Sequence, residues 1–148
     1  MQLANKIFFS QVEAELAKGQ EVQLRVKGYS MRPLLRNERA TVVLTPYGNE
    51  ELRRGDIVLF RYNDKHILHR IVQLTPTRIT LQGDGNYHQQ EHCTTQDVLA
   101  VVRCVIYPHG RVIACQSRLW KFLSRLWLTC PALLRRYTLA LLFRLGYK

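Results

Sequence analysis

One serine in the chain stands where a nucleophile could work, between a predicted strand and a predicted turn. Residues 21–27 alternate apolar and polar side chains, which predicts a half-buried strand. Gly28 ends this strand two residues before Ser30, and Met31–Leu35 is predicted to form a short helical turn. A tight bend of this kind exposes a hydroxyl, and the amides at the start of a helical turn can point at an oxyanion. The same features are also typical of a serine that caps a helix.

Three further segments follow this serine in a defined order. The motif Gly-x-Ser-Met-x-Pro covers residues 28–33, and Arg-Gly-Asp-Ile-Val-Leu-Phe covers residues 54–60. His-Arg-Ile-Val follows at residues 69–72, and Gly-Asp-Gly-Asn at residues 83–86. Over about residues 22–107, this ordered series resembles the superfamily of serine peptidases that includes signal peptidases and LexA-type self-cleaving repressors.

The resemblance implies a role for three side chains. Ser30 would be the nucleophile and His69 its general base, at a position where most bacterial members have lysine. Strand alternation groups His69 with Ile67 and Ile71 on one apolar face, and a neutral imidazole can take the proton of a serine near pH 7. Asp84 matches the aspartate that assists in the family, and it could fix the imidazole tautomer. The alternatives are a core histidine and a turn-forming aspartate.

The chain departs from the family pattern around the serine. Many signal peptidases have a second serine where this chain has Gly28, and the usual Pro-Thr-Leu is replaced by Pro33–Leu35. Oxyanion stabilisation would therefore depend on backbone amides, that of Ser30 foremost, and we assign Gly28, Tyr29 and Met31 to oxyanion and substrate binding. These departures bear on which substrate is cleaved more than on which reaction is catalysed.

The resulting prediction is a serine endopeptidase that cleaves a precursor or leader peptide through an acyl-enzyme. One alternative is a self-cleaving regulator, but only 29 residues precede Ser30, too few for a helix-turn-helix domain. The chain also has no Ala-Gly or Cys-Gly bond for self-cleavage. The other alternative is a non-catalytic peptidase-like module that binds at a membrane surface, although an inactive protein need not keep both the serine and the histidine.

Other reactive side chains are weaker candidates. His88 and His92 are four residues apart beside Cys93, but no second cysteine pair or carboxylate cluster completes a metal site. Residues 87–97 are predicted to form a polar loop. Lys65 lies at a predicted hairpin tip in water, where a lysine is a poor base at pH 7. We therefore predict no metal and no cofactor.

The order of elements predicts a mainly β fold, either a twisted antiparallel sheet or a partly open barrel. An N-terminal helix over residues 3–18 precedes it, and amphipathic helices follow it. These patterns divide the chain into an N-terminal helix (1–20), a peptidase domain (21–115) and a basic helical tail (116–148). Besides the strand before the serine, strands are predicted at 40–44, 56–61, 66–74, 78–82, 98–107 and 111–115.

Charge is distributed unevenly along the chain. The net charge is +11, all 11 acidic residues lie at or before Asp97, and nine Lys and Arg follow Val98. Such asymmetry points to nucleic acid or to an anionic membrane as a partner of the tail. Tryptophans and leucines at helical spacing favour lipid or protein over nucleic acid, either as an interfacial anchor or as a face that packs on the sheet or on a second subunit.

The sequence also bears on the compartment. We find no cleavable signal peptide, and the four cysteines form no C-x-x-C pair, so we expect reduced thiols. The longest uncharged stretch near the C-terminus, residues 126–134, has nine residues, and spanning a bilayer takes about 20. These features predict a protein of the cytoplasm or of the inner face of the membrane, while the oligomeric state stays open.

Overall fold

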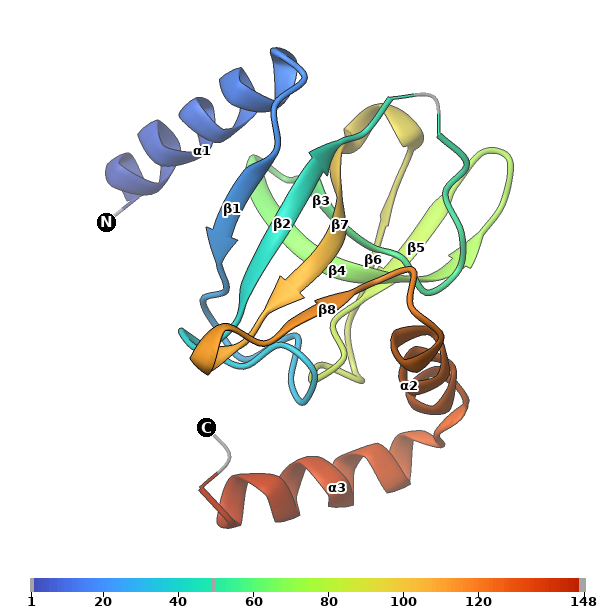
Figure 1. The fold of residues 1–148 in the computed structure, drawn as a ribbon. Coiled ribbons are helices and arrows are strands. Elements are labelled where there is room, and N and C mark those ends of the chain that lie inside the picture. The colour runs from blue at the N-terminus through green and yellow to red at the C-terminus, as the bar shows by residue number, and fades with distance from the viewer. Residues whose placement is uncertain (1, 49, 147–148) are drawn as a thin grey trace.

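The computed structural model describes residues 2–48 and 50–146, and an antiparallel sheet forms its centre (Figure 1). The strand order is β1-β2-β7-β3-β4-β5-β6, with β8 also paired to β7, and the sheet is not closed into a barrel. The predicted mainly β fold is therefore confirmed. The strands are β1 (Val22–Arg25), β2 (Thr41–Pro46), β3 (Ile57–Tyr62), β4 (Lys65–Leu74), β5 (Ile79–Gln82), β6 (Gln90–Cys93), β7 (Val98–Ile106) and β8 (Val112–Ala114).

Helices precede and follow the sheet, as the sequence predicts. Helix α1 lies beside one end of the sheet, and α2 and α3 lie at the opposite end (Figure 1). Ser117 caps α2, because its hydroxyl accepts a hydrogen bond from the amide of Trp120. The helices are α1 (Gln2–Ala17), α2 (Arg118–Thr129) and α3 (Ala132–Arg144), with short 3-10 helices at Thr95–Asp97 and Pro108–Gly110.

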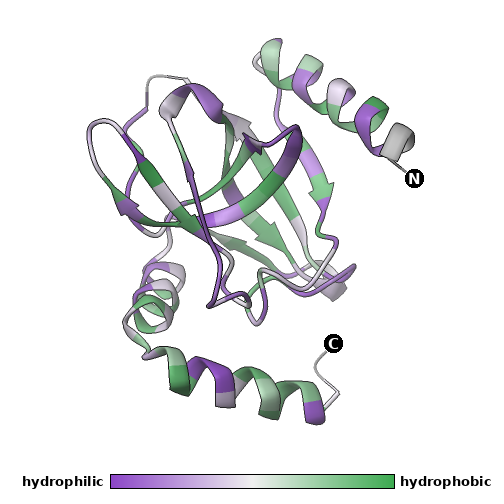
Figure 2. Cartoon of the chain, turned by 180° about the vertical axis from the view of Figure 1, so that it is seen from behind, coloured by the Kyte–Doolittle hydropathy of each residue, from purple (hydrophilic) through white to green (hydrophobic). Residues whose placement is uncertain are grey.

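Two clusters of buried apolar side chains make up the core. The larger cluster gathers α1, β2 and β7, and it includes Met31 and Leu35 from the turn after β1 and Trp120 from α2. The smaller cluster lies over β3, β4 and β5, around Phe60 and Ile71. Figure 2 shows hydrophobic residues concentrated along the strands and mixed with hydrophilic ones along α2 and α3. The turn after β1 is therefore anchored in the core.

A two-residue turn joins β3 to β4 and sets the register of the central hairpin. Tyr62 pairs with Lys65, and both Asn63 and Asp64 adopt positive φ, at 47° and 59°. Asparagine and aspartate tolerate this conformation better than most residues, and it matches the twist of a hairpin. The predicted hairpin tip is confirmed.

The structure corrects two local predictions. Part of residues 87–97, predicted as a polar loop, forms strand β6 on the edge of the sheet. Buried and exposed residues alternate along β6, with Glu91 and Cys93 buried. The sequence does not show this alternation, because glutamate is seldom a buried residue. The second correction concerns the segment after Ser30, which is a run of turns and not a helix, although Leu35 donates to the carbonyl of Met31 at 2.9 Å.

Candidate active site

The turn that carries Ser30 is held from both sides. Before it, the Gly28 amide donates to Asn37 Oδ1 at 2.9 Å; φ at Gly28 is +98°, a conformation that glycine adopts without steric cost. After it, the Met31 side chain is buried in the larger core cluster. Ser30 itself is half-buried, so its side chain sits at the edge of the protein surface on an anchored segment.

His69 lies in the middle of β4 and is buried. Its Nδ1 is 2.8 Å from Glu91 Oε2, and its ring lies 6.5 Å from the ring of Phe60. The carboxylate accepts a hydrogen bond when Nδ1 carries the proton, and this tautomer leaves a lone pair on Nε2. The pair therefore orients the second ring nitrogen as an acceptor.

Gly83 shows how near Ser30 and His69 come to each other. A Cβ atom added at Gly83 would lie 2.9 Å from His69 Nε2 and 3.1 Å from Ser30 Cβ, and still closer to the Ser30 carbonyl oxygen. Both side chains therefore border the same small space, with Nε2 as the ring atom that faces it. Only a residue without a side chain fits between them.

The Gly-Asp-Gly segment after β5 packs against the serine turn along its backbone. Gly85 donates its amide to the Ser30 carbonyl at 2.7 Å, and a Cβ at Gly85 would lie 2.6 Å from the carbonyl oxygen of Tyr29. Both glycines are thus explained by close approach to the turn. Their contacts fix the serine turn relative to the strand that carries His69.

Sequence reasoning did not identify Glu91. Ile71, Leu81 and Glu91 lie in register across β4, β5 and β6, and His69 stands two residues before Ile71 on the same strand. Period-two alternation directs these side chains to one face of the sheet, which is how Glu91 comes to contact the imidazole. The sequence offered only a weak signal for this role, a glutamate between the polar residues Gln90 and His92. The pairing of this segment with β5 is visible only in the structure.

Residues 4–106 match the model of the peptidase S24-like family. The match covers more than half of the chain and contains Ser30, His69, Asp84 and Glu91. The chain belongs to the peptidase S24-like family. A search of curated proteins found no significant match.

In this S24-like protein, the second carboxylate, Asp84, contacts an arginine and not the imidazole. Its two oxygens accept from Arg70 Nε and Nη2 at 2.8 and 2.7 Å, and both side chains are buried. Burial alone would lower the pKa of Arg70, but the charge of Asp84 and its hydrogen bonds outweigh burial and raise that pKa. The structure thus separates Asp84 from the position that we predicted for it beside His69.

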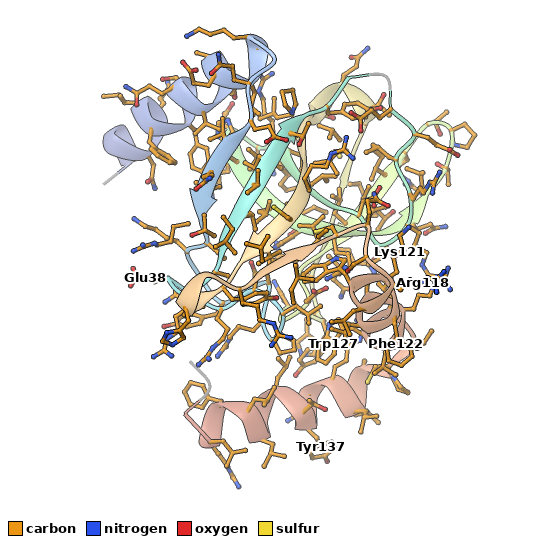
Figure 3. The ribbon with its side chains drawn as sticks, viewed as in Figure 1. Glu38, Arg118, Lys121, Phe122, Trp127 and Tyr137 are labelled. Atoms are coloured by element: carbon orange, nitrogen blue, oxygen red, sulfur yellow. The ribbon has the colours of Figure 1, made fainter. Side chains whose placement is uncertain are left out.

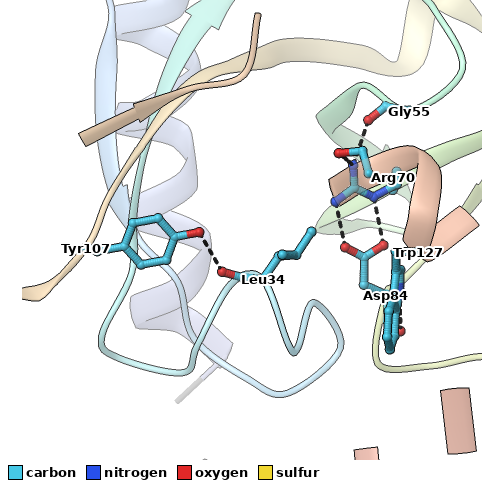
Figure 4. A network of polar contacts seen from close by, with 7 residues as sticks. Leu34, Gly55, Arg70, Asp84, Tyr107 and Trp127 are labelled. Carbon is cyan, nitrogen blue, oxygen red and sulfur yellow. Dashed lines mark hydrogen bonds and ion pairs between the residues drawn. The ribbon is translucent and has the colours of Figure 1, made fainter. Parts of the chain in front are cut away.

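The Arg70–Asp84 pair also joins the S24-like region to α2, which lies beyond the matched residues. Arg70 Nη1 donates to the Gly55 carbonyl at 2.9 Å and to Ser124 Oγ at 2.8 Å. Trp127 Nε1 donates to the carbonyl oxygen of Asp84 at 3.1 Å (Figure 4). Helix α2 therefore contacts and stabilises the loop that packs on the serine turn.

The remaining predicted site residues of this S24-like protein fall in several environments. The Tyr29 side chain is exposed, and the Arg32 guanidinium stacks over its ring at 4.5 Å. Two of the side chains considered as metal ligands have other surroundings. His92 Nδ1 is 3.1 Å from Thr80 Oγ1, and burial raises the pKa of the Cys93 thiol to about 12. Within residues 2–48 and 50–146, no three His, Cys, Asp or Glu side chains cluster as metal ligands would. All four cysteines are free.

Proposed function

We propose that the protein is a serine endopeptidase in which Ser30 is the nucleophile, His69 the general base and Glu91 the residue that orients the base. The observation that carries this proposal is the common space beside Gly83, which Ser30 and His69 Nε2 both border. Membership of the peptidase S24-like family supports a peptidase reaction. Glu91 takes the role that we had predicted for Asp84.

The proposed reaction proceeds through an acyl-enzyme. Nε2 of His69 removes the proton of the Ser30 hydroxyl while Oγ attacks the carbonyl carbon of the scissile peptide bond. The protonated imidazole, stabilised by Glu91, then passes this proton to the leaving amine, and the C–N bond breaks. Water next attacks the ester with Nε2 as base, which releases the new carboxylate and restores the serine.

The oxyanion of the tetrahedral intermediate needs donors from the serine turn. We assign this role to backbone amides, with the amide of Ser30 foremost. The amide of Gly28 already donates to Asn37, so we expect it to support the turn. The exposed Tyr29 ring is the candidate surface for an extended substrate segment.

The substrate we propose is a precursor or leader peptide with small residues near the cut. The resemblance to signal peptidases and self-cleaving repressors supports it, because those enzymes take extended segments of this kind. A half-buried nucleophile next to an exposed aromatic ring is compatible with an extended chain lying along the turn.

The test compares the wild-type protein with Ser30→Ala and His69→Ala on a library of precursor peptides, read out by mass spectrometry. We expect each substitution to reduce cleavage by at least about 10³-fold. Ser10→Ala and His109→Asn, at exposed positions on α1 and in the turn between β7 and β8, are the controls and should cleave normally, since asparagine tolerates the positive φ of 68° at residue 109. An acylating inhibitor should label the wild-type protein and not Ser30→Ala. Cleavage that persists in Ser30→Ala would exclude the mechanism.

A further inference from the structure

The two C-terminal helices expose large apolar side chains in stripes. On α2, Leu119, Phe122 and Leu126 follow i, i+3, i+7 spacing and are 49%, 63% and 58% exposed. On α3, a second stripe at i, i+4, i+8 spacing is exposed by 58% or more, and it consists of Leu133, Tyr137 and Leu141. Soluble proteins rarely expose large contiguous apolar patches, and such patches commonly mark a site of interaction.

These stripes belong to helices that are fixed to the protein by their other faces. Trp120 and Ser124 of α2 are buried, and Trp127 hydrogen-bonds the loop beside the serine turn. Arg135 of α3 donates to the Leu128 carbonyl at 2.8 Å and lies over the Trp127 ring. The outward apolar face is therefore a feature of the folded protein.

Basic side chains surround the stripes, and acidic ones are absent from this part of the sequence. Arg118, Lys121 and Arg125 flank the stripe on α2, and Arg136 and Arg144 are exposed on α3. No acidic residue follows Asp97 in the sequence. Figure 3 shows Arg118 at the outer edge of the molecule and Tyr137 on the side of α3 turned away from the sheet.

We infer that the outer face of α2 and α3 docks on an anionic lipid bilayer. Leucine and aromatic side chains would enter the boundary between headgroups and acyl chains, while the arginines contact lipid phosphates. A second copy of the chain would instead bring this strongly positive face against an identical one, and nucleic acid offers no apolar layer for the stripes. Among the described helices none is long and apolar enough to cross a membrane.

Helix α3 also contacts the turn that carries the nucleophile. The Arg32 guanidinium, two residues after Ser30, lies 5.9 Å from the centre of the Phe143 ring. A bilayer docked on the outer face of α3 would therefore be separated from the serine turn by this one helix, about 10 Å in diameter. If the proposed peptidase function holds, such docking favours precursors that are themselves bound to the membrane.

The docking test uses the full chain and large vesicles of phosphatidylcholine, with and without 30% phosphatidylglycerol (about one anionic lipid in three), separated by sedimentation. We expect wild-type protein to bind the anionic vesicles and to dissociate at high salt. Removing two charges with Arg118→Gln and Arg125→Gln should weaken binding about 30-fold, because each cation near an anionic surface contributes about 1 kcal/mol. Arg25→Gln with Arg78→Gln, two exposed arginines at the end of β1 and before β5, is the charge-matched control.

The apolar contribution is tested by Phe122→Asp, for which we expect at least about a tenfold loss of binding. Val112→Asp is the matched control, because Val112 is 56% exposed on β8, away from both helices. Equal binding of Phe122→Asp and wild type, or equal binding to neutral and anionic vesicles, would overturn the inference. The inference would also be overturned if the wild-type protein did not bind vesicles but formed a dimer, and if Phe122→Asp dissociated that dimer.

This experiment separates the docking surface from the peptidase site. Ser30→Ala should bind vesicles as the wild type does, since Ser30 lies outside both helices. Phe122→Asp should cleave a soluble peptide at the wild-type rate. Loss of vesicle binding with cleavage intact therefore concerns the outer face alone, and loss of cleavage with binding intact concerns the site alone.

Discussion

Two neighbours on β4, His69 and Arg70, illustrate how one kind of pairing can serve two purposes. Each is buried, and each contacts a buried carboxylate, Glu91 for the imidazole and Asp84 for the guanidinium. Strand alternation sends the two side chains to opposite faces of the sheet. The guanidinium donates to carboxylate, carbonyl and hydroxyl oxygens. The imidazole has one nitrogen at Glu91 and the other beside Gly83, in the space that Ser30 also borders.

The two pairs differ in whether the basic side chain keeps a nitrogen atom that its carboxylate partner and the surrounding protein do not use. A buried charge that is fully bonded holds segments together, and here Arg70 connects the loop after β5 to α2. A buried imidazole with one nitrogen bonded keeps its second nitrogen available for proton transfer. The comparison predicts that the Glu91 pair affects rate, and that the Asp84 pair affects stability.

The largest expected effect is on the rate of Glu91→Gln. An amide can present its NH₂ group to Nδ1, which would place the proton on Nε2 and remove the base. We expect kcat to fall by about 10³- to 10⁴-fold, as expected when a triad loses the carboxylate that fixes its tautomer. The glutamine is nearly isosteric, so the urea midpoint should change little. A kcat within twofold of wild type would mean that Glu91 does not orient the base.

The second largest effect is on the stability of Arg70→Met. This change leaves the Asp84 carboxylate buried without its partner, and we expect the free energy of unfolding to drop by about 3–5 kcal/mol. Replacing both partners, as Arg70→Met with Asp84→Leu, should recover much of that loss, because no uncompensated charge remains. Urea denaturation of the wild type, both single variants and the double variant measures this coupling. A double variant no more stable than Arg70→Met would contradict it.

The same comparison shows what could be read from the sequence and what could not. Ser30, His69 and the Gly-Asp-Gly segment were found because each belongs to a local motif with a recognisable spacing. The choice between Asp84 and Glu91 depended on the registers of β4, β5 and β6, which join residues far apart in the chain. A strand arginine also gives no local sign that it is buried, so the partner of Asp84 was not predictable.

The strands were predicted wherever apolar residues alternate or run together. Strand β6 was missed because its inward positions are occupied by Glu91 and Cys93. Helices α2 and α3 were predicted from their spacing. The position of α2, however, depends on the hydrogen bond of Trp127 to the loop beside the serine turn and on that of Ser124 to Arg70. Tertiary contacts of single polar atoms leave no periodic signal.

The third effect concerns the space that His69 and Ser30 share. In Gly83→Ala, the new methyl group would press on both side chains and on the Ser30 carbonyl, so the serine turn must shift. We expect about a 10²-fold loss in kcat/KM from the misplaced nucleophile, with a loss of stability of about 1–3 kcal/mol. Gly48→Ala is the control, because a Cβ there has no heavy atom within 4 Å. Equal activity of the two variants would show that the site tolerates the displacement.

The smallest effect concerns a second histidine–carboxylate pair on β4, that of His66 with Glu13 of α1. Glu13 also pairs with Arg61, whose hydrogen bond lowers the pKa of Glu13 below its ordinary value of 4.5, with a smaller lowering from His66 and an opposing effect of burial. A lowered carboxyl pKa contributes stability above about pH 4.5, and this contribution is lost as the pH falls through the pKa of the folded state. Glu13→Gln should therefore be less stable than the wild type at pH 7, by at most about 1 kcal/mol for a partly exposed pair.

The difference in the free energy of unfolding between the two proteins should be smaller at about pH 3 than at pH 7, because protonation of the wild-type carboxyl progressively removes its contribution as the pH falls. Urea denaturation at the two pH values measures the difference, and kcat measured at pH 7 should be equal for both. The His66 ring is stacked on Phe9 with ring centres 4.4 Å apart, whereas the His69 ring has Nε2 beside the serine turn. A fall in kcat for Glu13→Gln would mean that a histidine–carboxylate pair outside the Ser30 site also takes part in catalysis, and the contrast between His69 and its neighbours on β4 would fail.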